Sequence, residues 1–128
     1  MKPLLLDSNA YLWLLYESNR LGPKTLKRLQ AADTVYVSAA CLWELAIKHA
    51  KGRLPYSPGE LAKGMDALGA ELLPIETRHL ENLRNIKLPH KDPFDTLLVA
   101  QTEAGNCIFI TSDKNILQSK YPARDVSE

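Results

Sequence analysis

Four acidic residues in this sequence occupy positions where carboxylates could act together. Asp7 directly follows the apolar run 4–6, Glu44 lies in a mostly apolar helical stretch, Asp95 follows Asp-Pro-Phe, and Asp113 comes just after another apolar run. Each acid taken alone also fits a helix cap, an acid offsetting a helix dipole or an exposed ion pair. Four carboxylates at one edge would repel one another unless cations bound there. Their oxygens suit Mg²⁺ or Mn²⁺ rather than zinc, and such ions can activate water against a phosphodiester.

The segment HKDPFDTLLVAQ, residues 90–101, separates the roles of two neighbouring aspartates. Asp92 precedes Pro93 and is therefore kept out of the helical conformation, whereas Pro93 suits the first position of a helix. Asp92 is expected to cap that helix, which leaves Asp95 in the first turn free to face a site. His90 could bind a metal, but we interpret it as a polar loop residue.

The elements that must position these acids follow from the hydrophobic pattern. Four short apolar runs predict strands buried on both faces of a parallel sheet, at 3–7, 34–38, 71–75 and 107–111. Helical patterns lie between and beside them, at 9–16, 23–32, 39–50, 58–68, 77–84 and 93–104. This alternation predicts an α/β fold. Since sites in open parallel sheets form at the carboxyl ends of strands, Asp7 and Asp113 are expected at the same rim.

Helix boundaries are marked by residues that favour caps. Ser8 is expected to cap the helix 9–16, residues 57–60 form a plausible capping box, and Gly105 is a typical stop for the helix 93–104. Glu44 and Lys48 lie on a narrow polar stripe of the helix 39–50. Lys48 and the basic residues that follow it either contact phosphates or interact with the helix C-terminus.

Composition limits the classes of function. The 128 residues suit a single domain, 1–128, with 45% hydrophobic and 24% charged residues and a formal net charge of +1. This balance gives no overall field for nucleic acid or membranes. Cys41 and Cys107 are expected to be buried, reduced thiols. We expect no signal peptide and no membrane span, and hence a cytoplasmic protein. Trp13, Trp43 and Phe94 are assigned to the core or an oligomer interface.

The chain resembles PIN-domain ribonucleases, specifically the VapC-type toxins of bacterial toxin–antitoxin pairs. The resemblance rests on four segments in the family's order: LLLDSNAYLW, VSAACLWELAIKHAKGRL, LPHKDPFDTLLVAQ and ITSDKNI, at 4–13, 37–54, 88–101 and 110–116. It implies a PIN-like, Rossmann-like three-layer α/β/α fold with a mainly parallel sheet of four to five strands. It also implies a homodimer and a cognate antitoxin.

The resemblance assigns chemistry to the four acids. Asp7, Glu44, Asp95 and Asp113 would be the catalytic residues and would hold Mg²⁺ or Mn²⁺ for hydrolysis of RNA, with tRNA or rRNA loops as targets. Substrate contacts are expected from residues with hydroxyl or ammonium groups nearby: Ser8, Lys48, Thr111 and Ser112. The hydroxyls of Thr111 and Ser112 could instead orient a carboxylate.

Two positions depart from the family pattern, and two other functions stay open. Asn9 stands where the family has histidine, and Thr96 stands where it often has arginine. One alternative is a PIN domain that binds RNA or a partner without cutting. The other is a receiver-like phosphoacceptor module, which is disfavoured because Asp7 has no acidic neighbour.

Overall fold

The computed structural model describes residues 1–90 and 92–128. Within them the chain forms five strands and nine helical segments, of which η1 and η2 are 3₁₀ helices. In chain order these are β1 (Leu4–Leu6), α1 (Ser8–Tyr16), η1 (Ser18–Arg20), α2 (Pro23–Ala31), β2 (Val35–Ser38), α3 (Ala39–Ala50), α4 (Pro58–Leu68), β3 (Glu71–Leu73), α5 (Thr77–Glu81), η2 (Asn82–Asn85), α6 (Pro93–Ala104), β4 (Ile108–Thr111), α7 (Lys114–Leu117) and β5 (Ala123–Asp125). No helix in the described ranges combines the length and the apolar character needed to cross a bilayer.

The strands form one parallel sheet in the order β3-β2-β1-β4-β5. The central strand β1 pairs with β2 and β4, so that Leu6 lies opposite Val37 on one side and Ile110 on the other. All three are almost fully buried, as expected for strands covered on both faces. The predicted parallel sheet of four to five strands is confirmed.

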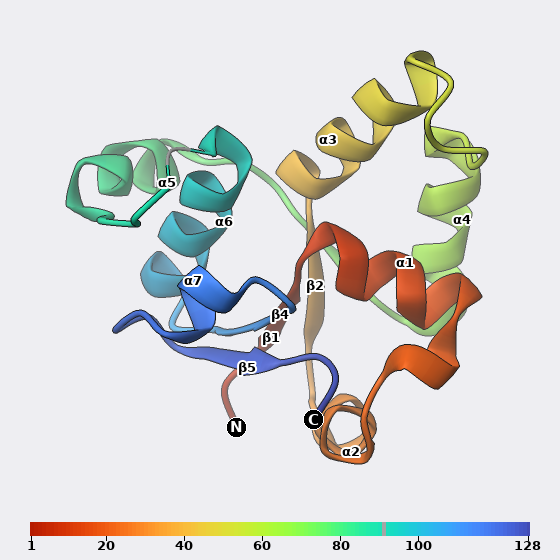
Figure 1. The fold of residues 1–128 in the computed structure, drawn as a ribbon, viewed down its shortest axis with the longest axis horizontal. Helices are drawn as coiled ribbons and strands as arrows, with labels where there is room; N and C mark the ends of the chain where they lie inside the picture. Colours follow the sequence, from red (N-terminus) through yellow and green to blue (C-terminus); the bar gives the residue numbers. More distant parts are fainter. Residues whose placement is uncertain (91) are drawn as a thin grey trace.

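Alternate residues of β1 divide the core into two layers. Leu4 and Leu6 belong to a cluster that includes buried side chains of α1, α3 and α4. Leu5 points the other way, into a cluster with α6 and α7. Figure 1 shows α5, α6 and α7 on one side of the sheet and α1 and α4 on the other. The predicted three-layer α/β/α architecture is confirmed.

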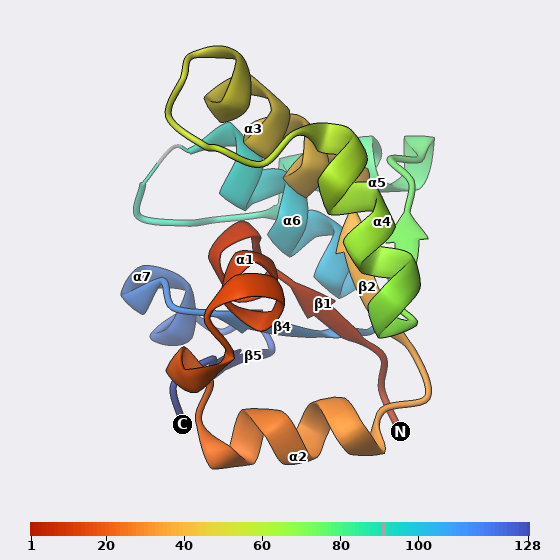
Figure 2. The same cartoon turned by 90° about the vertical axis from the view of Figure 1, so that its right-hand side faces the viewer.

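The amino ends of the strands lie at the opposite end of the molecule from α3. Figure 2 shows α2 there with both chain ends. The backbone N–H of Gly22, which precedes α2, donates to the carbonyl of Val126. A Cβ at Gly22 would lie 2.0 Å from the carbonyl oxygen of Glu128, so this close approach requires glycine. The carboxyl ends of the strands are left free to form a site.

Several boundaries differ from those expected. The helix predicted at 77–84 is α5 followed by η2, and β5 corresponds to no predicted apolar run. Ser8 is not the cap of α1: Asp7 takes that position, and its Oδ1 accepts the backbone N–H of Ala10. The capping box of Ser57 with Glu60 is present at α4, and α6 ends at Gly105.

Candidate active site

The carboxyl edge of the sheet gathers all four predicted acids around one cavity of about 230 Å³. Asp7 follows β1 and Asp113 follows β4, and these strands are parallel neighbours. Glu44 comes from α3, which begins directly after β2, and Asp95 comes from the first turn of α6. The cavity is lined by Asp7, Ser8, Asn9, Glu44, Lys48, Asp92, Asp95, Leu98, Ser112 and Asp113. The structure therefore brings together residues that are far apart in the sequence.

Asp7 is held through both of its carboxylate oxygens. Oδ1 accepts the backbone N–H of Ala10 at 2.7 Å, and Oδ2 accepts the hydroxyl of Thr111 at 2.5 Å. Burial raises the pKa of Asp7, the bonds from Thr111 and Ala10 oppose this, and the charge of Glu44 adds to it. The two hydrogen bonds hold the Asp7 carboxylate in one position, while burial and the charge of Glu44 disfavour its ionised form.

Glu44 is oriented by a residue from a different helix. The hydroxyl of Ser8 donates to Oε1 of Glu44 at 2.5 Å. Ser8 is buried and lines the cavity, so its hydroxyl serves the site instead of capping α1. Lys48, one helical turn after Glu44, also lines the cavity. Among the described residues lining it, Lys48 is the only one with an amino group on its side chain.

Asp95 lies beside a cap that another residue already supplies. Oδ1 of Asp92 accepts the backbone N–H groups of Phe94 and Asp95, at 2.9 and 3.3 Å, which confirms Asp92 as the N-cap of α6. Burial raises the pKa of Asp95 to about 7, and the charges of Asp92 and Asp113 add to this effect. The second aspartate of the Asp-Pro-Phe-Asp segment thus faces the other acids.

Asp113 combines two contacts. Its Oδ1 accepts the backbone N–H of Ile116 and so caps the short helix α7, at 3.1 Å. Its backbone N–H donates to the hydroxyl oxygen of Thr111 at 3.0 Å. Because the same hydroxyl donates to Asp7, Thr111 links the two strand-end acids. Ser112, which lies between Thr111 and Asp113 in the sequence, also lines the cavity.

His90 approaches the acids more closely than its interpretation as a polar loop residue suggests. Its Nε2 lies 3.4 Å from Oδ2 of Asp113 and 3.7 Å from Oδ2 of Asp95. Oxygen and nitrogen atoms of these three residues all lie within 4.8 Å of one another. Sequence spacing gives no signal for this contact with Asp113, because the two residues are distant in the sequence and meet only through tertiary packing.

Other residues considered from the sequence lie outside the cavity. Thr96, at the position where the family often has arginine, donates its hydroxyl to the carbonyl of Asp92 at 2.9 Å. Trp43 is 58% exposed, so its assignment to the core is wrong; its ring and that of Phe94 form a T-shaped pair with centroids 5.1 Å apart. A role of Trp43 in an oligomer interface stays a prediction.

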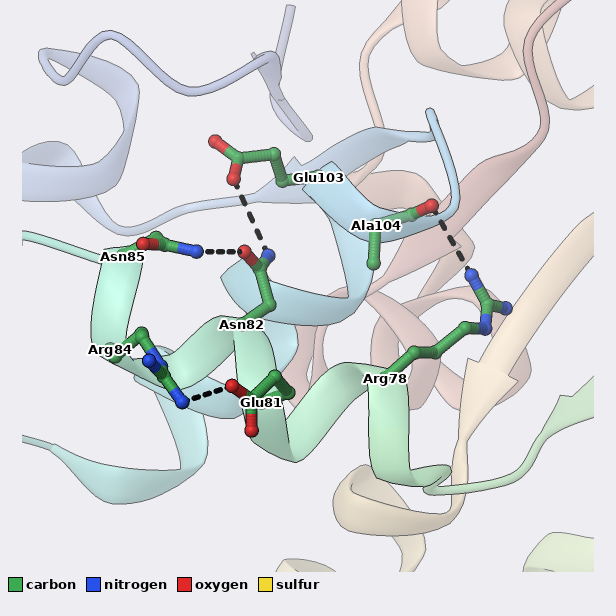
Figure 3. Close-up of a pocket in the computed structure, with 7 residues that line it drawn as sticks. All are labelled: Arg78, Glu81, Asn82, Arg84, Asn85, Glu103 and Ala104. Carbon is green, nitrogen blue, oxygen red and sulfur yellow. Dashed lines mark hydrogen bonds and ion pairs between the residues drawn. The ribbon is translucent and has the colours of Figure 1, made fainter.

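A larger hollow of about 590 Å³ lies against α5, η2 and the end of α6, and it has a different character. Its polar side chains contact one another: Arg84 pairs with Glu81, Asn82 donates to Glu103, and Arg78 donates to the carbonyl of Ala104 (Figure 3). These contacts satisfy exposed side chains locally. The acidic cavity is therefore the better candidate for chemistry.

The donor set of the acidic cavity fits a divalent cation. Carboxylate oxygens from four parts of the chain line it, and the imidazole nitrogen of His90 lies beside one of them, Oδ2 of Asp113. The raised pKa values of Asp7 and Asp95 show that burial disfavours their charged forms and that neighbouring carboxylates add to this cost. A cation would relieve it, and oxygen-rich sets of this kind suit hard ions.

Comparisons with known proteins agree with this architecture. No curated protein matches the sequence. A chain of the DNA-bound VapBC complex from Salmonella typhimurium is similar, with 14% identity, 98% of each chain covered and a TM-score of 0.70. A chain of VapBC-1 from nontypeable Haemophilus influenzae has 16% identity over 98% of this chain and 99% of its own, with a TM-score of 0.69. A chain of VapBC2 from Rickettsia felis, bound to a promoter DNA fragment, has 11% identity over 96% of this chain and 98% of its own, with a TM-score of 0.66.

At these identities the similar structures show only that the fold is shared. The family model described as PIN domain matches residues 4–121, which include all four acids. This match covers most of the sequence, and the chain belongs to the PIN domain family.

Proposed function

We propose that this chain is a Mg²⁺- or Mn²⁺-dependent endoribonuclease and the toxin of a VapC-type toxin–antitoxin pair. The observation that carries the proposal is the convergence of four acids from four parts of the chain on one cavity. Membership of the PIN domain family supports it. Several of the solved structures to which the fold is similar are VapBC complexes, and VapBC is a family of toxin–antitoxin systems, which supports a cognate antitoxin as partner.

The four acids would hold the metal, each supported by its own surroundings. Thr111 and the start of α1 fix Asp7, and Ser8 fixes Glu44. Outer partners of this kind orient ligands and contribute to metal affinity. When bound, the ion would lower the pKa of a water molecule and stabilise charge on the phosphate oxygens.

Substrate contacts are proposed for the polar groups around the acids. The ammonium group of Lys48 lines the cavity and is suited to a phosphate oxygen, which gives affinity without sequence selectivity. Ser112 offers a hydroxyl between β4 and Asp113. The hydroxyls of Ser8 and Thr111 already donate to carboxylates, so we propose that they act on the substrate only through those acids.

The decisive experiment measures RNA cleavage by the purified chain with and without added Mg²⁺ or Mn²⁺. Cleavage should need the metal, stop with EDTA and be lost in Asp7→Asn. Asp33→Asn, at an exposed acid away from the cavity, should cut like the unaltered chain. Equal cutting by Asp7→Asn, or cutting that EDTA leaves unchanged, would refute the catalytic assignment.

Two further outcomes separate the remaining alternatives. RNA binding without cleavage at any metal concentration would favour a PIN domain that binds and does not cut. The toxin assignment predicts that expression of this chain alone arrests growth and that a co-expressed antitoxin relieves the arrest. Normal growth during expression of folded, RNA-cleaving protein would contradict it. Sedimentation of the purified chain tests the proposed homodimer.

A further inference from the structure

We propose that His90 is a direct metal ligand of this site and that its nitrogen makes the site prefer Mn²⁺ over Mg²⁺. The inference rests on the metal site of the proposed function and adds a residue to it. It starts from the position of the ring: Nε2 of His90 lies 3.4 Å from Asp113 Oδ2 and 3.7 Å from Asp95 Oδ2. His90 thus faces Asp95, five residues further along the same segment, and Asp113, which follows β4.

The imidazole nitrogen is buried without a partner. Nε2 of His90 is enclosed and forms no hydrogen bond with any described residue, although 27% of the whole side chain is exposed. A buried polar atom left without a hydrogen bond requires an explanation. Here the atom is aimed between two carboxylate oxygens at distances longer than the usual 2.7–3.2 Å of a nitrogen–oxygen hydrogen bond.

The spacing is that of ligands sharing an ion. Two ligand atoms each about 2.1 Å from a cation, and seen from it at 90–110°, lie about 3.0–3.4 Å apart. The separation of His90 from Asp113 falls at the end of this range, and that from Asp95 needs a small side-chain movement. All three groups offer atoms within 4.8 Å of one another.

The competing explanation is an ion pair. A protonated His90 would offset part of the negative charge of Asp95 and Asp113 and would occupy the place of a metal. The two roles make opposite predictions for metal affinity. Removing a ligand weakens binding, whereas removing a competing cation strengthens it. The choice of metal also differs, because Mg²⁺ prefers oxygen ligands and water, while imidazole suits transition metals.

The chain provides a matched control for this test. Its three histidines are His49, His79 and His90. Nδ1 of His49 lies 2.8 Å from the carbonyl oxygen of Leu54, at the far end of α3 from the acids. Nδ1 of His79 accepts the backbone N–H of Glu76 in the core. His49→Ala therefore removes an imidazole without touching the cavity.

The experiment titrates Mn²⁺ and Mg²⁺ into the unaltered chain, His90→Ala and His49→Ala, and records pulsed electron paramagnetic resonance of bound Mn²⁺. We expect a nitrogen coupling to Mn²⁺ in the unaltered chain and in His49→Ala, but not in His90→Ala. The Mn²⁺ dissociation constant should rise at least about 10-fold in His90→Ala, the loss given even by removing an outer partner of a ligand. The Mg²⁺ constant should change less.

A second measurement needs no substitution at His90. The unaltered chain is labelled with ¹⁵N-histidine. The coupling to Mn²⁺ should then appear at the frequency of ¹⁵N in place of that of ¹⁴N, which shows that the nitrogen belongs to a histidine. Absence of nitrogen coupling, coupling that survives His90→Ala, or Mn²⁺ binding that is unchanged or tighter in that variant would overturn the inference. Failure of the unaltered chain to bind Mn²⁺ at all would instead overturn the metal site of the proposed function.

Discussion

Asp95→Asn should make the metal-free chain more stable while abolishing its response to metal. Asp95 is a third-position residue of α6, where an acid that only offsets the helix dipole stabilises the fold by about 0.3–1 kcal/mol. In that case the amide would destabilise the chain slightly. In the site described above, the same carboxylate lies among other acids and is costly. The sign of the stability change distinguishes the two roles.

The magnitude follows from the pKa of Asp95. A value of about 7 instead of the ordinary 3.8 corresponds to a cost of up to about 4 kcal/mol for the charged form. Solvent screening is limited because 25% of the side chain is exposed. The amide must also be buried, and it loses its charge interaction with the helix. We therefore expect a gain of about 1–3 kcal/mol in the free energy of unfolding at pH 8.

The pH dependence gives an internal check. A carboxyl whose pKa is raised by folding binds a proton more readily in the folded chain, so its contribution favours folding at low pH and is lost as pH rises. The stability gain of Asp95→Asn over the unaltered chain should be near zero at about pH 4. It should grow between the ordinary pKa of 3.8 and about 7, and then level off.

The assay is urea unfolding in EDTA from pH 4 to 8, repeated with Mn²⁺. The unaltered chain should gain about 2.7 kcal/mol when Mn²⁺ is at 100 times its dissociation constant, whereas Asp95→Asn should gain almost nothing. Asp92→Ala is the control for the start of α6, since it removes the cap and should cost about 0.5–2 kcal/mol. A destabilised Asp95→Asn, or a gain independent of pH, would refute the reasoning.

Three further substitutions test how the site is supported. Thr111→Val keeps the shape but removes the hydroxyl bound to Asp7; calorimetry should show Mn²⁺ affinity lowered about 10–100-fold, and unchanged affinity would count against this role. Ser8→Ala frees Glu44 and should slow RNA cleavage about 10-fold without changing the circular dichroism spectrum; an unchanged rate would contradict the orienting role. Gln101→Leu leaves the buried hydroxyl of Ser38 without its acceptor and should lower the free energy of unfolding by about 1–3 kcal/mol in urea; a neutral effect would show that this bond is dispensable.

The buried sheet could be predicted because its strands carry the signal of double coverage. β1 and β4 are continuous apolar runs, and each is covered on both faces. β5 carries no such signal, because the edge strand Ala-Arg-Asp is only partly buried. It is held by backbone bonds: Phe109 donates its N–H to the carbonyl of Pro122, and Val126 donates to that of Thr111. Hydrogen bonds between backbones leave no trace in residue type.

Contacts between distant segments were also hidden from the sequence. The polar stripe on the helix 39–50 singles out Glu44, but nothing in the pattern pairs it with Ser8. The sequence also left open whether Trp43 belongs to the core or to an oligomer interface, and the structure leaves it exposed. Spacing along one helix gives the direction of a side chain; the element that faces it comes only from tertiary packing.

The strand-end acids show why a choice between a helix cap and a site residue could not be made from the sequence. A carboxylate has two oxygens, and Asp7 and Asp113 each use Oδ1 to accept a backbone N–H at a helix start. Their Oδ2 atoms remain for Thr111 and for the approach of His90. The cap fixes the side chain in one rotamer, which aims the second oxygen. The two roles are therefore compatible, and the cap contributes to the rigidity that a metal ligand needs.

Asp95 is the exception that supports this view. The cap of α6 belongs to Asp92, so Asp95 is not needed to accept a backbone N–H at the start of this helix. Burial among other acids raises the pKa of Asp95 to about 7. An acid at this position adds little to the stability of the helix and lowers the free energy of unfolding of the metal-free chain. Of Asp7, Asp95 and Asp113, Asp95 is the one whose presence a structural role explains least. This is why its replacement by asparagine, and not that of Asp7 or Asp113, separates stability from metal binding most clearly.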